Sequence, residues 1–202
     1  MKWILIISVV SVALTSCGGE PGKSADVEQS ATISTPVSNN PDVFNQSFEN
    51  LLSSYYDLKD ALVEYDTARA NVASKKVAYF ADSLRLDQLG NDSSGTKQET
   101  ASNYAGTIAG SAMGFIGEKE WNAKKKEFQM ISDAMYDLSL AVKYNAQKVY
   151  RQRCTMAFND EEEAYWLSNS GKVVNPYLGK KHPKYKAAML ECGEVTDSLG
   201  FK

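Results

Sequence analysis

The chain has 202 residues and a formal net charge of −3 at pH 7, so it is long enough for one ordinary domain with a real core. No stretch of the sequence is strongly basic, and we therefore expect no nucleic-acid partner. The single histidine, His182, excludes most histidine-rich metal sites and enzymes that need two histidines.

The N-terminus predicts a bacterial lipoprotein signal peptide over residues 1–16. A short positive start is followed by an apolar run from Trp3 to Leu14, which is too short to cross a bilayer reliably. Leu14-Thr15-Ser16-Cys17 then has the form of a lipobox, with an aliphatic residue and two small residues before a cysteine. We expect the thiol of Cys17 to carry the lipid, because several acyl chains on one residue give stable membrane anchoring.

Gly18 follows the lipidated cysteine where some inner-membrane lipoproteins carry aspartate. This favours the bacterial cell envelope and an outer-membrane anchor that faces the periplasm. Residues 17–41 are rich in small and polar residues and predict a flexible tether.

Long amphipathic helices are expected over residues 42–153. An apolar stripe spaced by threes and fours predicts a helix from Asp42 to Tyr65, a second helix is expected over 67–89, and another over 118–151. Lys124, Lys125 and Lys126 are expected on the outer face of that last helix. The predicted fold is mainly α, an antiparallel helical bundle of about four helices with a small C-terminal β-hairpin appendage.

Residues 97–117 leave more than one structure open. Gly106, Gly110 and Gly114 recur every four residues and would form one flat face of a helix, as membrane or self-association helices have. We favour close packing against another helix, or a partly disordered insertion, because the apolar stretch is short.

The C-terminal segment, residues 154–202, is expected to lie on the bundle. The pattern predicts a hairpin between residues 164–167 and 172–174, with its turn at residues 168–171, and a short last helix over 184–190.

Four soft donors stand near the ends of this segment. Cys154 and Met156 share one face of an extended chain, and Met189 and Cys192 share one face of a helical turn. Together they could bind copper(I), with His182 as an accessory ligand. The alternative is a structural disulfide between the two cysteines, which are the only ones left after Cys17 takes the lipid, with the methionines filling the core.

No enzyme is expected, because no nucleophile–base pair and no nucleotide-binding motif can be found. The acidic tract at residues 160–163 lacks the alternation of a calcium loop and predicts a solvated turn.

The segments Cys154-Thr155-Met156, Ala164-Tyr165-Trp166, Asn175-Pro176-Tyr177 and Met189-Leu190-Glu191-Cys192 carry a family resemblance. Together with Tyr55 to Val63 and Glu127 to Leu138, they resemble the domain-of-unknown-function 3347 family of bacterial envelope proteins, from about Phe44 to Val195. Thr155 stands where the family usually has proline.

The resemblance also implies a function, because this domain occurs at the C-terminal end of some periplasmic adaptors of heavy-metal efflux systems. With the four soft donors, this leads to the first hypothesis, an envelope lipoprotein that binds a soft metal ion, in the first place copper(I), and buffers it or passes it to an efflux system. The alternative is a non-enzymatic interaction module with a Cys154–Cys192 disulfide and no metal.

Overall fold

The computed structural model describes residues 40–90 and 94–200. The predicted signal peptide, the lipidation of Cys17 and nearly all of the predicted tether lie outside these residues. Among the described residues, no helix is both long enough and apolar enough to cross a membrane.

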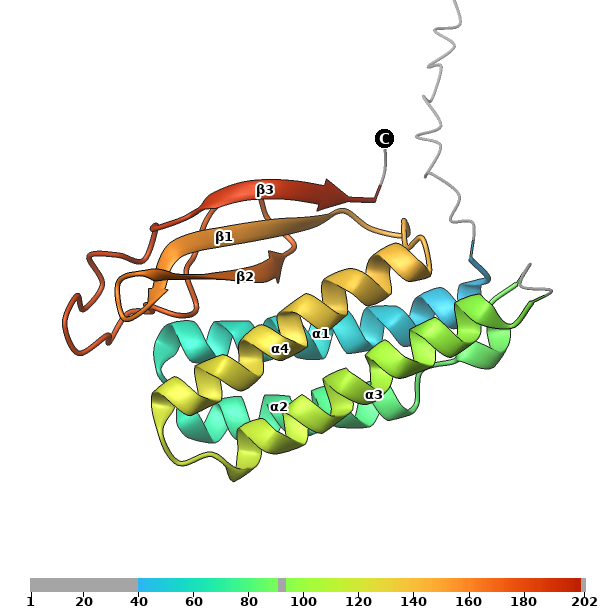
Figure 1. Ribbon diagram of the computed structural model, residues 1–202, viewed down its shortest axis with the longest axis horizontal. Helices are drawn as coiled ribbons and strands as arrows, with labels where there is room; N and C mark the ends of the chain where they lie inside the picture. Colours follow the sequence, from blue (N-terminus) through green and yellow to red (C-terminus); the bar gives the residue numbers. More distant parts are fainter. Residues whose placement is uncertain (1–39, 91–93, 201–202) are drawn as a thin grey trace, which may run out of the picture. The chain divides into compact units, whose positions relative to one another are not determined.

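Four long helices form an antiparallel bundle (Figure 1). They are α1 (Asp42–Glu64), α2 (Thr67–Asp82), α3 (Thr96–Gly117) and α4 (Trp121–Ala141), with a 3₁₀ turn at Leu86–Gln88. Each helix runs opposite to the next one in the chain, as short connections require. The predicted mainly helical fold is confirmed.

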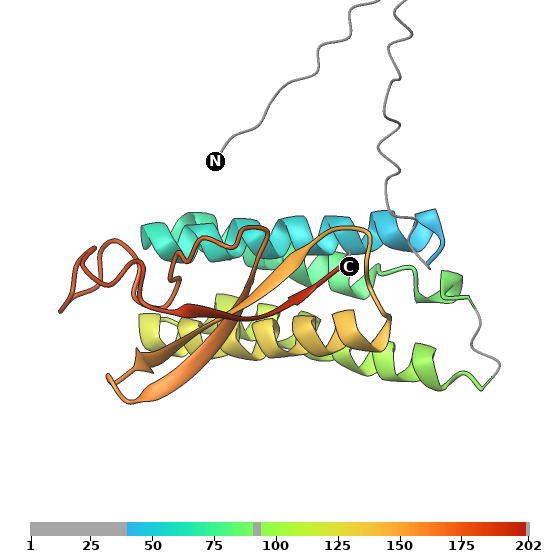
Figure 2. The same ribbon diagram turned by 90° about the horizontal axis from the view of Figure 1, so that it is seen from above.

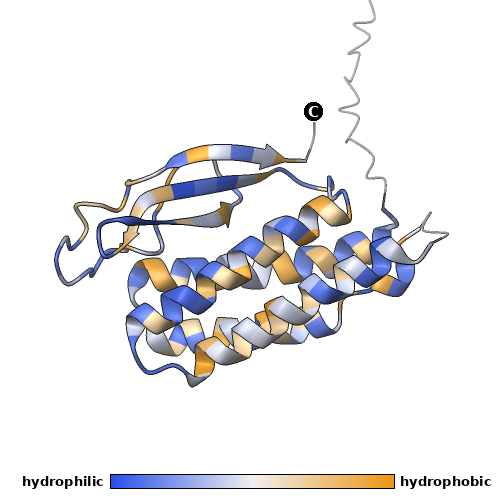
Figure 3. Ribbon diagram, viewed as in Figure 1, coloured by the Kyte–Doolittle hydropathy of each residue, from blue (hydrophilic) through white to orange (hydrophobic). Residues whose placement is uncertain are grey.

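The stripe predicted for the first helix is the inner face of α1. Its members from Phe44 to Leu62 are fully buried, and the helix ends where Tyr65 takes a left-handed φ of 57°. Apolar residues on the other helices face the same core, whereas hydrophilic residues occupy the outer surfaces (Figure 3). Burial of this shared apolar area is the main stabilising contribution to the bundle.

Residues 97–117 are helical and lie within α3, which contacts α2 and α4. The alanines of this helix face the core, but Gly106 and Gly110 are exposed, and a methyl group added at either one would meet nothing within 4 Å. Gly114 does approach α4, because a Cβ there would lie 3.0 Å from the Glu127 side chain. The expected close packing against another helix is therefore confirmed, but it uses the alanine face and Gly114 rather than all three glycines.

The helix predicted to reach residue 151 ends at Ala141. Lys143 adopts a left-handed φ of 53°, and the chain turns so that the Tyr144 ring stacks on Phe48 with centroids 4.3 Å apart. Beyond Val142, the predicted helix depended on Val149 alone continuing the helical spacing of apolar residues, and Val149 fits the alternation of a strand equally well. Lys124 and Lys125, expected outside, are each only 2% exposed.

A three-stranded antiparallel sheet with strand order β2-β1-β3 forms the appendage. Its strands are β1 (Val149–Phe158), β2 (Glu162–Ser168) and β3 (Glu194–Leu199). The sheet lies over α1 and α4, on the side of the bundle away from α2 and α3 (Figures 1 and 2).

The position of the predicted hairpin was wrong. The observed hairpin joins β1 to β2 through Asn159 and Asp160, which have positive φ values of 53° and 66°, as the central residues of a type I′ turn have. Residues 172–174 form no strand, because β3 takes the second edge of β1 and the Gln152 amide donates to the carbonyls of Ser170 and Lys172.

The predicted helix over 184–190 was also wrong. This segment consists of turns, in which Lys186 has a left-handed φ of 53° and the Leu190 carbonyl accepts from the backbone N–H of Asn175.

A chain of hydrogen bonds fastens the sheet to the bundle. The backbone N–H of Leu167 on β2 donates to the Tyr55 hydroxyl at 2.9 Å, and that hydroxyl lies 2.7 Å from the Ser132 hydroxyl. Ser132 in turn donates to the Phe128 carbonyl at 2.8 Å. The Ser132 hydrogen is thus used, so Tyr55 donates to Ser132 and accepts from Leu167. One buried phenol therefore links α1, α4 and β2.

Tyr55→Phe is expected to lower the free energy of unfolding by about 2 kcal/mol, because it leaves the buried Leu167 N–H without its acceptor. Tyr56→Phe is the matched control, since the Tyr56 hydroxyl is buried and has no hydrogen-bond partner among the described residues. Urea unfolding of both variants measures the difference. Equal losses would show that the Leu167–Tyr55–Ser132 chain does not fasten the sheet.

Candidate functional site

Two thiols meet where the last segment of the chain returns to the sheet. The Sγ atoms of Cys154 on β1 and Cys192 before β3 lie 3.0 Å apart. Cys154 is fully buried, whereas Cys192 is partly exposed. Two of the predicted site residues, 38 positions apart in the sequence, are therefore brought into direct contact.

Strand pairing delivers Cys192 to this place. Glu194 pairs with Arg153 and Val195 with Gln152, so β3 begins beside the residue before Cys154. Gly193 connects Cys192 to this strand with a φ of 142°, and a Cβ there would lie 2.5 Å from the Arg153 carbonyl oxygen. Only glycine fits such a close approach of two backbones.

The Asn175 side chain also fixes the position of Cys192. Its Nδ2 donates to the Cys192 carbonyl at 2.7 Å, while its Oδ1 accepts from the backbone N–H groups of Tyr177 and Leu178 at 2.8 and 3.0 Å. Asn175 is fully buried. In the sequence, Asn175 stood out only as part of the family resemblance, although an Asn before a proline is a known signal for side-chain capping of a turn.

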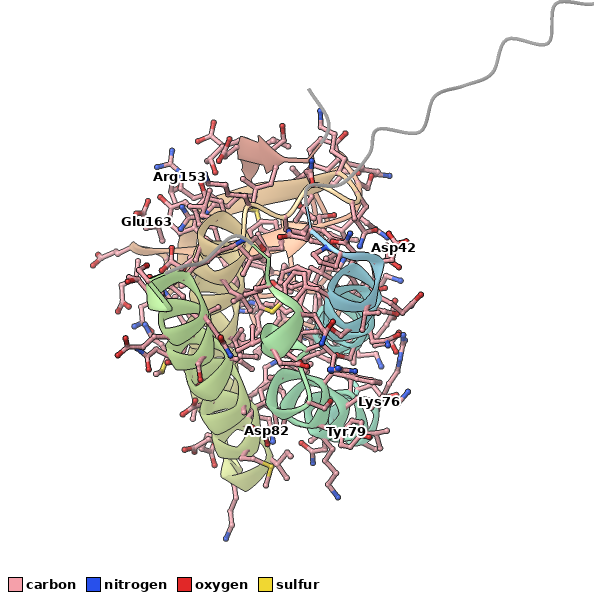
Figure 4. The ribbon with its side chains drawn as sticks, turned by 90° about the vertical axis from the view of Figure 1, so that its right-hand side faces the viewer. Asp42, Lys76, Tyr79, Asp82, Arg153 and Glu163 are labelled. Atoms are coloured by element: carbon pink, nitrogen blue, oxygen red, sulfur yellow. The ribbon has the colours of Figure 1, made fainter. Side chains whose placement is uncertain are left out.

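The surroundings of Cys192 keep its thiol protonated. Burial, and then the hydrogen bond with Cys154, raise the pKa of the Cys192 thiol to about 12. The nearby Arg153 guanidinium is paired with Glu194 at 2.5 Å and with Glu163 at 3.3 Å. Arg153 and Glu163 lie together on the outside of the strand pair (Figure 4). A thiol of this kind is a weak nucleophile at neutral pH, unlike a catalytic cysteine.

The other predicted ligands have different surroundings. Met156 and His182 line a cavity that also includes residues of α4, and Met189 packs against the hydrophobic core. Within residues 40–90 and 94–200, no group of three or more histidine, cysteine, aspartate or glutamate side chains could hold a metal ion.

The cavity has a volume of about 410 Å³ and lies at the end of the bundle where α1 ends and α4 begins. The loops at residues 157–160 and 178–184 complete it. The residues that line it include Tyr65, Trp121, Lys125, Met156, Phe158 and His182.

The charge inside the cavity comes from Lys125. Its ammonium donates to the Tyr177 carbonyl at 3.1 Å and lies 5.7 Å from the Phe158 ring centroid. Burial lowers the pKa of Lys125 to about 8. Burial and then the charge of Lys125 also lower the pKa of His182. The burial of Lys125 was not expected from the sequence, because three consecutive lysines usually mark a solvated surface.

The fold and the site define a four-helix bundle that carries a small sheet with two thiols in contact, one buried and one partly exposed. A family model described as "Protein of unknown function (DUF3347)" matches residues 51–148, and this match supports the family resemblance seen in the sequence. The matched region covers most of the bundle and ends just before β1, so the thiol pair lies beyond it. No curated protein and no solved structure matches the chain.

Proposed function

We propose that this chain is a lipid-anchored, non-enzymatic interaction module of the bacterial envelope, whose sheet is held closed by a disulfide between Cys154 and Cys192. The observation that carries the proposal is the 3.0 Å separation of the two Sγ atoms. A disulfide needs about 2.05 Å, so the atoms must approach by about 1 Å, which the partly exposed Cys192 can do from the turn before β3.

The chemistry requires an oxidant. Each thiol loses one hydrogen, and an oxidised disulfide carrier of the envelope takes up the two electrons and two protons and becomes a dithiol. Cys192 is the thiol that such a carrier reaches first, because it lines a surface hollow with Thr155 and Glu194, whereas Cys154 is fully buried. Cys154 then displaces the carrier from the mixed disulfide.

Mass spectrometry of the full-length protein purified from the cell envelope tests the disulfide. The expected result is a mass two hydrogens below that of the dithiol, and a peptide that joins Cys154 to Cys192 after digestion without reductant. Two free thiols that react with an alkylating reagent in the freshly isolated protein would contradict the proposal.

The second candidate is copper(I) binding, for buffering or for delivery to a periplasmic efflux adaptor. The observation that favours it is the same pair of soft donors, one of which is open to the surface hollow. In a tetrahedral site with metal–sulfur bonds of about 2.3 Å, the length known for zinc, the two Sγ atoms would lie roughly 3.8 Å apart. Metal binding of this kind would therefore require the two sulfurs to move apart. The family resemblance supports an efflux adaptor as the partner.

Titration of the reduced full-length protein with copper(I) against a competing chelator tests this candidate. Cys154→Ser with Cys192→Ser should abolish competition, whereas Met156→Leu should leave it unchanged if the two thiols act alone. A loss with Met156→Leu would instead support the wider sulfur set that includes Met156 and Met189. Unchanged competition in the double cysteine variant would exclude this site.

A further inference from the structure

The cavity beside α4 is built to receive negative charge. Lys125 is 2% exposed, and among the described residues its ammonium has one hydrogen-bond acceptor, the Tyr177 carbonyl. An ammonium has three N–H donors, and a buried one is stable only when acceptors surround it. The space inside the cavity is where further acceptors can lie.

Other hydrogen-bond donors line the same space. The indole Nε1 of Trp121 and the hydroxyl of Tyr65 are buried and make no hydrogen bond of good geometry among the described residues. Their rings lie 4.8 Å apart, and burial raises the pKa of Tyr65 while the nearness of Trp121 offsets part of that rise. The Nδ1 atom of His182 accepts from the backbone N–H of Tyr185 at 3.3 Å, so the neutral imidazole carries its hydrogen on Nε2. Four residues that carry such donors therefore line one cavity.

Acidic residues do not cancel this arrangement. Asp160 lines the cavity, but its carboxylate accepts from the Lys184 ammonium and from the Tyr185 hydroxyl, and these bonds lower its pKa. Glu120 lies on the exposed end of α4. A bound cation would meet the uncompensated Lys125 charge, which disfavours a metal ion at Met156 and His182.

The walls of the cavity are apolar. Trp121, Met156 and Phe158 contribute aromatic and thioether surface, and the volume of about 410 Å³ is within the usual range for small organic ligands. A hydrated inorganic anion would leave these walls uncovered, whereas an organic body would cover them.

We propose that this cavity binds a small organic carboxylate with an aromatic or aliphatic body, whose carboxylate accepts hydrogen bonds from Lys125 and the neighbouring donors while the body lies against Trp121 and Phe158. This site is separate from the thiol pair and does not depend on the function proposed above. It requires no movement of the helices, since the cavity is already present.

Phenylacetate and 2-phenylethylamine are suitable probes, because they share a ring and differ in charge. Calorimetric titration of the full-length protein measures affinity, and the NMR signal of the Trp121 indole N–H locates the binding. We expect phenylacetate to bind and shift this signal, and we expect 2-phenylethylamine to do neither. Absence of phenylacetate binding at millimolar concentrations, or equal binding of the amine, would overturn the proposal.

Lys125→Met removes the charge and keeps a side chain of similar length, and it should weaken phenylacetate binding about tenfold or more. Lys76→Met is the matched control, because Lys76 is an exposed lysine on α2 and is outside the cavity lining. Equal affinities of the two variants would refute the role of Lys125.

Trp121→Phe keeps the charge and removes the indole donor, so it provides a second test if Lys125→Met does not fold. Calorimetry should then show binding weakened about threefold to tenfold. An affinity equal to that of the unchanged protein would contradict the proposed contact.

Discussion

Reduction of the proposed Cys154–Cys192 disulfide is expected to lower the free energy of unfolding of the full-length protein by about 4 kcal/mol. The bond would close a loop whose ends are 38 positions apart, and cross-linking a loop of this length removes much of the conformational freedom of the unfolded chain. The loop contains β2 and the cavity loop at residues 178–184, so its closure would stabilise both.

Guanidinium unfolding with and without a phosphine reductant, followed by circular dichroism, measures this difference. The control is the variant with Cys154→Ala and Cys192→Ala, whose unfolding should not respond to reductant. If the disulfide-bonded protein unfolds at the same denaturant concentration in both conditions, the bond does not stabilise the domain. Copper(I) binding predicts the opposite response, in which the reduced protein becomes more stable when the ion is added.

The helical part of the fold was predictable because each stripe repeats over many turns. In α1, apolar residues from Phe44 to Leu62 all indicate the same face, and every one of them is buried. The end of α4 was not predictable from the same rhythm. Val142 belongs to the buried stripe at the C-cap of α4, whereas Val149 fits the period by chance and begins β1. The helix stops where Tyr144 packs on Phe48 of α1. A contact between distant segments decided the boundary, and sequence spacing does not contain it.

The sheet shows how a local signal can be outweighed. Ser168 to Gly171 is a good turn sequence, but Asn159 and Asp160 tolerate the positive φ of a type I′ turn as well. The chain turns at Asn159 and Asp160, because the longer strand β1 then pairs with β2 on one edge and with β3 on the other. The pairing of β3, residues 194–199, with β1 joins distant parts of the chain, and no local sequence pattern predicts it.

The candidate site was predictable in part. Two cysteines in one segment suggested a meeting of Cys154 and Cys192, and the structure places their sulfurs in contact. The donors of the cavity were hidden, because Tyr65, Trp121 and Lys125 belong to three unrelated patterns in the sequence: a helix end, a helix start and a lysine run. Only the fold brings them together at one end of the bundle.

Asn175→Ala is expected to lower the free energy of unfolding by about 3 kcal/mol, because it removes three side-chain hydrogen bonds at a fully buried position. It should also slow closure of the disulfide from the reduced protein. The Asn175 amide holds the Cys192 carbonyl, and without this bond the thiol samples positions farther from Cys154.

Asn169→Ala is the matched control, since Asn169 is an exposed asparagine in the turn before this segment. Urea unfolding under reducing conditions separates the packing loss from the effect of the disulfide, and alkylation followed by mass spectrometry measures the rate of closure. A stability loss without slower closure would mean that β3 pairing alone delivers Cys192, through Glu194 beside Arg153. Slower closure in the Asn175 variant alone would show that the buried amide sets the geometry of the thiol pair.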